Sequence, residues 1–235
     1  MAKPSEEILG TESIGKLCFR MGIPCVLAQL VNLLYSVVDR MYIGHMPDVG
    51  NLALAGLSLC MPILTIISAF SSFVAGGGAP LAAKALGEGN KDRAEKILGN
   101  GFSLLLFFAV TLSILAYIFK SPLLWLIGAS EETFDFANRY LSIYLIGTIF
   151  VQMSVGLNTF LTAQGRSRAA MISVIIGAVI NIALDPLFIF TFHMGIQGAA
   201  LATILAQGIS CAFVMALLWN PRTSLHLSLS HLRPD

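Results

Sequence analysis

One carboxylate and one amide stand out within an apolar run near residue 180. Asn181 and Asp185 are four residues apart in AVINIALDPLFIF (178–190), and Pro186 follows directly. Residues four apart lie on the same face of a helix, so the two side chains would point the same way. A carboxylate inside a bilayer costs roughly 2.5–3.5 kcal/mol or more and usually marks a functional site. Pro186 cannot donate to the Ile182 carbonyl, which leaves a further oxygen free one turn away.

The composition indicates that such apolar runs are membrane spans. Hydrophobic residues make up 56% of the chain and charged residues only 11%, and the mean hydropathy is +0.81. A soluble domain carries about 25% charged residues, so this chain has too few to cover its surface. We therefore predict an all-α protein spanning the lipid bilayer several times.

The net charge of +1 and the lack of a basic cluster give no sign of a nucleic-acid partner. The four cysteines lie in or beside apolar runs without a CxxC pair, so we expect them to serve packing.

Six segments are near the ~20 residues that a helix needs to cross the hydrocarbon. They are residues 17–43, 52–81, 97–119, 140–163, 169–192 and 196–219. We accordingly divide the chain into a polar N-terminal segment (1–16), a six-helix transmembrane lobe (17–219) and a polar linker (220–235). The N-terminus shows no cleavable signal peptide pattern.

Glycine and proline predict where these helices bend or stop. Pro24 lies inside the first span, where it removes a backbone hydrogen bond, so we expect a bend there. The sequence GGGAP (76–80) predicts a flexible or closely packed end to the second span. The charged stretch 84–96 is expected to be a connector, with Gly87 and Gly89 interrupting any continuous helix.

The distribution of basic residues predicts the orientation. Six spans place both termini on one side of the membrane. Eleven of the 14 Lys and Arg residues fall on that side, and only Arg40, Lys120 and Arg139 fall on the other. Because cytoplasmic loops are enriched in Lys and Arg, we expect both termini in the cytoplasm of a protein of the cell (inner) membrane.

Only two of the 13 acidic residues, Asp39 and Asp185, lie within the predicted spans. At about 1.5 Å per residue, both reach a similar depth in the outer half of the bilayer. Thr203 arrives at a comparable depth, whereas Asn158 lies nearer the inner side. Two carboxylates, an amide oxygen and a hydroxyl suit a hard monovalent cation. They equally suit a buried carboxylate that exchanges a proton, and the sequence does not choose between the two.

Structural explanations compete with this interpretation. A threonine in a membrane helix such as Thr203 often only links helices by hydrogen bonds. Asp39 could form an ion pair with the adjacent Arg40 at the interface. Asp185 is harder to explain structurally, because no basic residue in its own span can neutralise it.

Several spaced motifs resemble the multidrug and toxic compound extrusion (MATE) family of transporters. They are Pro24 in the first span, YSVVDRMYIG (35–44), LALAG (52–56), GGGAP (76–80), GEGN (87–90), residues 158–165, NIALDP (181–186) and GIQGAALAT (195–203). They cover nearly the whole chain in the family's order.

The resemblance implies a secondary active transporter rather than an enzyme. Such proteins have twelve spans in two six-helix lobes and export cationic or amphipathic compounds in exchange for Na⁺ or H⁺. It implies a first-lobe cation site, with Na⁺ as one candidate, at residues matching Asp39, Asn181, Asp185 and Thr203, with Asn158 and Tyr35 lining the same region. Pro24 and Pro186 would bend their helices. No organic cofactor is expected.

The length departs from the family, because six spans make a single lobe. Either the chain is a fragment or it must pair with a second lobe, in cis or as another copy, since alternating access moves one repeat against another. We expect the lone lobe to bind the coupling cation without transporting. Two alternatives are a lipid or oligosaccharide flippase lobe and an intramembrane aspartyl protease. The protease motifs Tyr-Asp and Gly-x-Gly-Asp are absent, because Val38 precedes Asp39 and Leu184 precedes Asp185.

Overall fold

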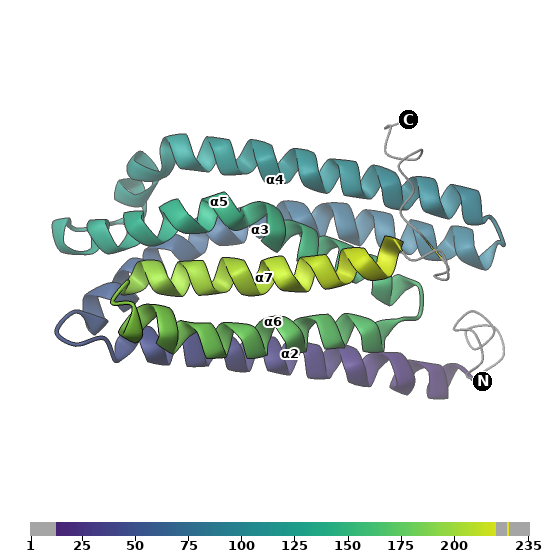
Figure 1. Ribbon diagram of the computed structural model, residues 1–235. Coiled ribbons are helices and arrows are strands. Elements are labelled where there is room, and N and C mark those ends of the chain that lie inside the picture. Colours follow the sequence, from purple (N-terminus) through teal and green to yellow (C-terminus); the bar gives the residue numbers. More distant parts are fainter. Residues whose placement is uncertain (1–12, 220–224, 226–235) are drawn as a thin grey trace.

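Six long helices form a single bundle in the computed structural model, which describes residues 13–219 and residue 225 (Figure 1). The helices are α2 (Ile14–Gly44), α3 (Gly50–Gly87), α4 (Lys91–Ile127), α5 (Glu131–Ala163), α6 (Ser167–Pro186) with its π-helical extension η1 (Leu187–Thr191), and α7 (Ile196–Trp219). All six are long and apolar enough to cross a membrane, which confirms the predicted fold class. Most of the predicted segments 1–16 and 220–235 lies outside the described residues.

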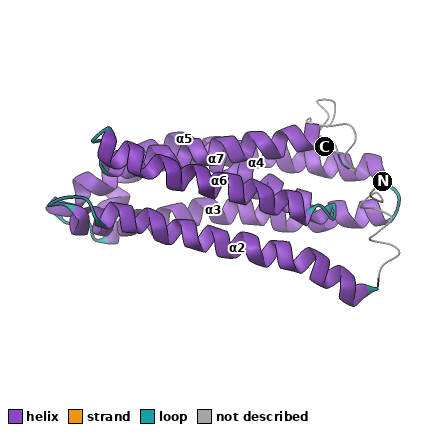
Figure 2. Ribbon diagram, turned by 60° about the horizontal axis from the view of Figure 1, so that its bottom comes forward, coloured by secondary structure: helices purple, strands orange, loops and turns teal. Residues whose placement is uncertain are grey.

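The arrangement leaves α2 attached mainly to one neighbour. Helix α5 packs against α3, α4 and α7, whereas α2 runs alongside α6 and makes smaller contacts with α3 and α7 (Figures 1 and 2). Only 6% of the most apolar window of α2 is buried, against 56% for α5. Most apolar side chains of α2 therefore face the surroundings of the bundle rather than its core.

The helices extend further than hydropathy predicted, and the prediction of a long connector at residues 84–96 is wrong. Helix α3 continues through the GGGAP sequence (76–80) to Gly87, so this sequence is not a helix terminus. Only residues 88–90 connect α3 to α4, with Gly89 in a left-handed conformation (φ 73°). The Asn90 side chain caps α4 by accepting a hydrogen bond from the Arg93 amide at 3.0 Å. Hydropathy does not detect such polar helix ends, because they lie beyond the hydrocarbon.

The two site prolines have different local settings. Pro24 is buried inside α2, and bending there stays a prediction. Pro186 ends α6, and the next five residues form the wider π-helical turn η1, with the Phe192 amide donating to the Leu187 carbonyl at 2.9 Å. Helix widening of this kind is common at functional sites.

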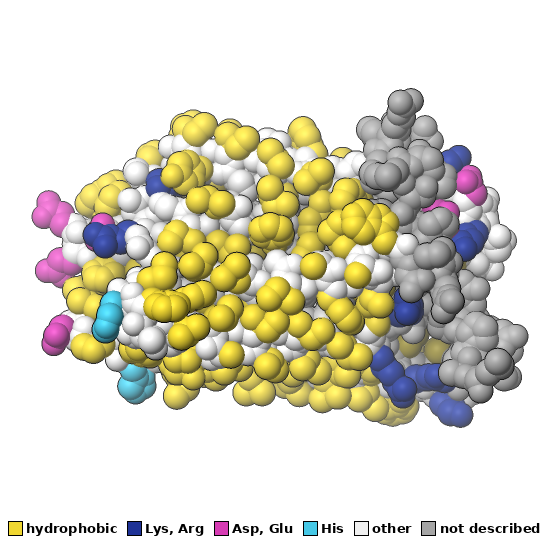
Figure 3. All heavy atoms as spheres, viewed as in Figure 1, with side chains coloured by type: hydrophobic (Ala, Val, Ile, Leu, Met, Phe, Trp, Pro, Cys, Tyr) yellow, Lys and Arg dark blue, Asp and Glu magenta, His cyan; other side chains and the backbone are white. Residues whose placement is uncertain are grey.

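Charged side chains separate toward the two ends of the bundle (Figure 3). On the face shown, most Lys and Arg lie at the end where α2 begins and α7 ends, and the long sides are apolar. Helix α2 begins and α7 ends at the same end of the bundle, as an even number of spans requires (Figure 1). Which end is cytoplasmic stays a prediction from the positive-inside rule.

A close contact between α3 and α5 at Gly56 provides a test of the packing. A Cβ atom on Gly56 would lie 2.8 Å from Phe136 Cβ and 2.9 Å from the Ala137 backbone nitrogen. We expect Gly56→Ala to force the helices apart, destabilise the protein by about 1–3 kcal/mol and lower its Tm in detergent. Gly76→Ala in the same helix is the matched control, because nothing lies within 4 Å of its added Cβ. Equal melting temperatures for the two variants would contradict the packing described.

Candidate functional site

Four of the polar residues singled out in the sequence meet where α2, α6 and α7 converge: Asp39, Asn181, Asp185 and Thr203. Asn181 and Asp185 on α6 are 2% and 0% exposed. The Asn181 amide nitrogen Nδ2 lies 3.2 Å from Asp185 Oδ1 and 3.4 Å from Thr203 Oγ1 on α7. The Thr203 hydroxyl donates to the Ala199 carbonyl at 3.0 Å, so its oxygen is oriented toward Asn181. Asn181 therefore links Asp185, one turn away on α6, to Thr203 on α7.

Asp39 on α2 completes this cluster. Its carboxyl group lies close enough to that of Asp185 for the two to interact directly. Three oxygens of the cluster are buried without a hydrogen-bond partner: Asp39 Oδ1, Asn181 Oδ1 and Asp185 Oδ2. Unpaired buried oxygens are costly, so their convergence indicates a site for a cation or a shared proton.

The competing ion pair between Asp39 and Arg40 does not form. Both residues are described, and no ion pair within 4 Å joins them. The Arg40 guanidinium instead lies 3.9 Å from the Met61 sulfur on α3. Arg40 is exposed, whereas the Asp39 side chain reaches toward α6.

Two tyrosines lie beside the carboxylates. Tyr35, one turn before Asp39 on α2, contacts the Gln207 side chain and lies near both aspartates. Tyr140 on α5 is 3% exposed and lies near Asp39 and Tyr35. Tyr140 was not predicted as a site residue. It begins the predicted fourth span on the outer side, so extending the depth count from acids to hydroxyls could have found it.

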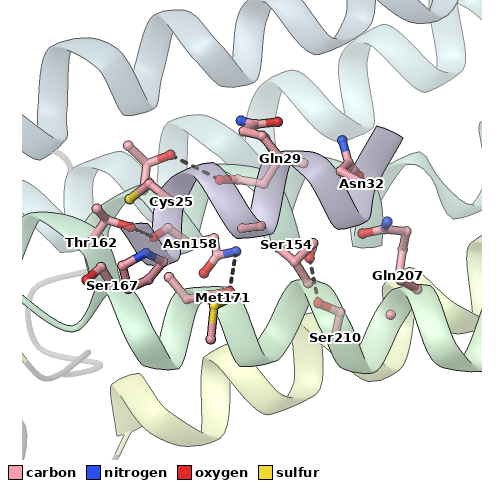
Figure 4. Close-up of a pocket in the computed structure, with 18 of the residues that line it drawn as sticks. Cys25, Gln29, Asn32, Ser154, Asn158, Thr162, Ser167, Met171, Gln207 and Ser210 are labelled. Carbon is pink, nitrogen blue, oxygen red and sulfur yellow. Dashed lines mark hydrogen bonds between the residues drawn. The ribbon is translucent and has the colours of Figure 1, made fainter. Parts of the chain in front are cut away.

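A cavity of about 280 Å³ lies between α2, α5, α6 and α7 on the other side of Tyr35. The polar side chains that line it are mainly amides and hydroxyls, and none of its lining residues is charged. The amide residues are Gln29, Asn32, Asn158 and Gln207 (Figure 4). Pro24 also lines it. Such a lining suits hydrogen-bonding ligands without requiring one sign of charge.

Asn158 belongs to this cavity rather than to the carboxylate cluster. Its amide nitrogen donates to the Ala170 carbonyl at 3.2 Å, and its Oδ1 is buried without a partner. Ala170 precedes Asn181 by eleven residues on α6, or about 16 Å at the helical rise. The structure therefore joins Asp39, Asn181, Asp185 and Thr203 and separates Asn158 from them, with Tyr35 between the two regions.

The donor types restrict what the cluster can hold. Carboxylate, amide and hydroxyl oxygens are ligands for hard cations rather than for transition metals. No group of three or more His, Cys, Asp or Glu residues suited to a metal occurs among the described residues. The four side chains fit Na⁺, and the paired carboxyl groups fit a proton.

Six helices long and apolar enough to cross a membrane, with two carboxyl groups close together between α2 and α6, are typical of a membrane transport protein. The family model MatE matches residues 24–187. The chain therefore belongs to the MATE family of transporters, as the sequence motifs predicted.

Curated relatives are about twice as long as the matched region. The chain is 26% identical over 224 residues to "Multidrug export protein MepA" of Staphylococcus haemolyticus, covering 94% of this chain and 49% of the relative. It is 31% identical over 196 residues to "FAD transporter" of Shewanella oneidensis, covering 81% of this chain and 42% of the relative. The chain thus spans about half the length of these relatives.

Solved structures agree in fold. The protein described as "Outward-facing conformation of a multidrug resistance MATE family transporter of the MOP superfamily" aligns with a TM-score of 0.90 and 26% identity, over 100% of this chain and 51% of that one. "Crystal structure of MATE in the straight conformation" aligns equally, over 100% of this chain and 52% of the other. The six helices therefore have the arrangement of half a MATE transporter.

Proposed function

We propose that this chain is the cation-coupling lobe of an antiporter that exports cationic or amphipathic compounds in exchange for Na⁺ or H⁺. The observation that carries the proposal is the buried cluster of Asp39, Asn181, Asp185 and Thr203 with its unpaired oxygens. Bound Na⁺ or a proton would satisfy these oxygens and lower the cost of burying two carboxyl groups.

Helix α2 would couple the cation to the exported compound. It carries Asp39 in the cluster and Tyr35 in the cavity, so a shift at one position is transmitted to the other. Because α2 packs mainly against α6, few other contacts oppose such a shift. Pro24 lies in the same helix and provides a position where α2 can bend.

The exposed polar residues of α2 support a partner lobe. Gln29, Asn32 and Arg40 are exposed on this span, where lipid would leave them unsatisfied. They are better satisfied by a water-filled cleft shared with a second six-helix lobe. The double length of the relatives supports the same partner.

The cavity lining also bears on the substrate. A flippase for anionic lipid would be expected to have basic residues in its cavity, and the lining of this one has none. The uncharged amides accept cationic drugs and also polar neutral groups. The relative called "FAD transporter" makes FAD a second compound worth assaying.

Gradient-driven efflux tests the proposal. The chain joined to a second lobe would be reconstituted in vesicles loaded with a fluorescent cationic dye, and an inward Na⁺ or H⁺ gradient would be imposed in separate experiments. We expect one of the two gradients to accelerate dye efflux and its collapse by an ionophore to abolish the acceleration. Efflux of dye or FAD that is insensitive to both gradients would contradict antiport.

A further inference from the structure

The cavity between α2, α5, α6 and α7 has a lining that narrows the class of compound it can hold. Its volume of about 280 Å³ is close to the lower end of the range for small-molecule sites, about 300 Å³. A volume of this size takes one compact group, such as a fused ring system, and a longer chain attached to the ring would lie outside it.

No charged group in the cavity would compensate a cationic ligand. None of the lining residues is charged, and Asp39 and Asp185 lie outside the lining. Among the described residues that line the cavity, Tyr35 is the only aromatic one, whereas quaternary ammonium ligands are held in cages of several aromatic rings. A cation entering the cavity would lose hydration without gaining a charged or aromatic partner in return. The lining therefore does not favour a positively charged ligand over an uncharged one of the same shape.

Most of the hydroxyl groups in the lining already donate hydrogen bonds within the protein. Thr159 and Thr162 each donate at 3.2 Å to the carbonyl four residues earlier on α5. The Ser154 hydroxyl donates to Ser210 Oγ at 3.2 Å, and Ser210 donates to a backbone carbonyl of α6 at 2.9 Å (Figure 4). Donors for a ligand must therefore come mainly from the amide side chains.

The four amide side chains of the lining fall into two pairs. The Asn158 nitrogen donates to a backbone carbonyl of α6 at 3.2 Å, and Gln207 contacts Tyr35, so the protein itself holds these two. Gln29 and Asn32 lie three residues apart on α2 and share a face of that helix (Figure 4). No hydrogen bond joins either of them to another described residue. The amides of Gln29 and Asn32 are therefore available to a ligand.

A side-chain amide binds a particular kind of ring edge. It presents an acceptor oxygen beside a donor nitrogen. It can therefore form two hydrogen bonds with a ring that has a donor and an acceptor next to each other, as Asn and Gln do with adenine. The apolar part of the lining includes Met171, and a thioether makes favourable contacts with aromatic rings.

We propose that the cavity selects an uncharged, planar heteroaromatic ring with adjacent donor and acceptor groups on one edge, bound by the amides of Gln29 and Asn32. Nucleobases and flavins have such edges. The inference rests on the proposed function, because it names the class of compound that the lobe would export. Selection comes from hydrogen bonding rather than from charge, so a planar cation of similar size binds less tightly.

Fluorescence titration of the purified chain in detergent compares the ligand classes. Riboflavin is uncharged and fluorescent, and its ring edge has an N–H group between two carbonyls. Its 3-methyl derivative has the same ring system without that donor, and ethidium is a planar cation of similar ring size. We expect riboflavin to bind more tightly than ethidium, and the 3-methyl derivative to bind roughly five- to a hundredfold more weakly than riboflavin.

Variants of Asn32 test the role of the amide. Asn32→Leu removes the amide at similar size, so we expect riboflavin affinity to fall roughly five- to a hundredfold, with little change in Tm because the position is exposed. Asn51→Leu is the matched control, because Asn51 is an exposed amide at the start of α3 outside the lining. We expect its riboflavin affinity to stay within about twofold of the wild type. Asn32→Asp adds a negative charge and loses a donor, so we expect it to bind ethidium more tightly and riboflavin more weakly.

The titration needs neither a second lobe nor a gradient, so its outcome is separate from that of the efflux experiment. Riboflavin binding that Asn32→Leu weakens and Asn51→Leu leaves intact would support the proposal even if efflux were insensitive to both gradients. Three results would overturn it: no riboflavin binding by the wild type, tighter binding of ethidium than of riboflavin, or equal riboflavin affinities of Asn32→Leu and Asn51→Leu. Gradient-driven dye efflux alongside any of these three results would leave antiport standing.

Discussion

Replacing Asp185 by asparagine is expected to abolish cation-driven efflux by the chain joined to a second lobe. The substitution keeps the size of the side chain. In the wild type, Asn181 Nδ2 donates to Asp185 Oδ1 at 3.2 Å, and the amide oxygen of the introduced asparagine can still accept this hydrogen bond. It removes the negative charge that a bound cation or an exchanged proton requires. Losing one charged ligand is worth about 1.5–3 kcal/mol, so we expect cation affinity to fall roughly ten- to a hundredfold. Dye efflux under a Na⁺ or H⁺ gradient measures the loss.

Asp135→Asn is the matched control for this experiment. Asp135 pairs with Arg139 at 2.8 Å at the start of α5, and both side chains are more than half exposed. Such surface pairs contribute about 0–1 kcal/mol, so we expect efflux close to the wild-type rate. Undiminished gradient-driven efflux by Asp185→Asn would remove Asp185 from the coupling mechanism.

A single copy of this chain is expected to bind the cation without transporting. Alternating access requires one repeat to move against another, and the described helices form one six-helix lobe. Reconstitution over a range of protein-to-lipid ratios measures this directly. Below one copy per vesicle we expect background dye movement only, while the chain joined to a second lobe transports in the same vesicles.

The dependence on protein density separates the two explanations for a six-helix chain. If copies pair, transport would rise with the square of protein density rather than in proportion to it. Transport proportional to density at less than one copy per vesicle would contradict the requirement for a second lobe.

The sequence predicted the helices well within the bilayer and poorly beyond it. Hydropathy identified all six spans, because the hydrocarbon requires continuous apolar runs. It missed the extension of α3 to Gly87 and the start of α4 at Lys91. Those ends are polar and depend on the Asn90 cap and on ion pairs such as Lys96 with Asp92 at 3.1 Å.

The part of the candidate site that is built around charged residues could be predicted from the sequence. Counting depth grouped Asp39 with Asp185, and one-turn spacing added Asn181, because a carboxylate in a span is rare enough to notice. The same count placed Asn158 nearer the inner side, where the structure also has it, apart from the carboxylates. Depth does not reveal which way a helix faces, so the count could not show that Asn158 lines the cavity.

Cation binding to the purified chain tests the central claim most directly. Equilibrium binding of radioactive sodium would be measured for the wild type, Asp185→Asn and Asp135→Asn. Proton release on sodium addition would be recorded in parallel. The cluster of Asp39, Asn181, Asp185 and Thr203 predicts saturable sodium binding or proton release in the wild type and in Asp135→Asn, and its loss in Asp185→Asn. Equal cation binding by the wild type and Asp185→Asn, or none by the wild type, would contradict a cation site at these residues.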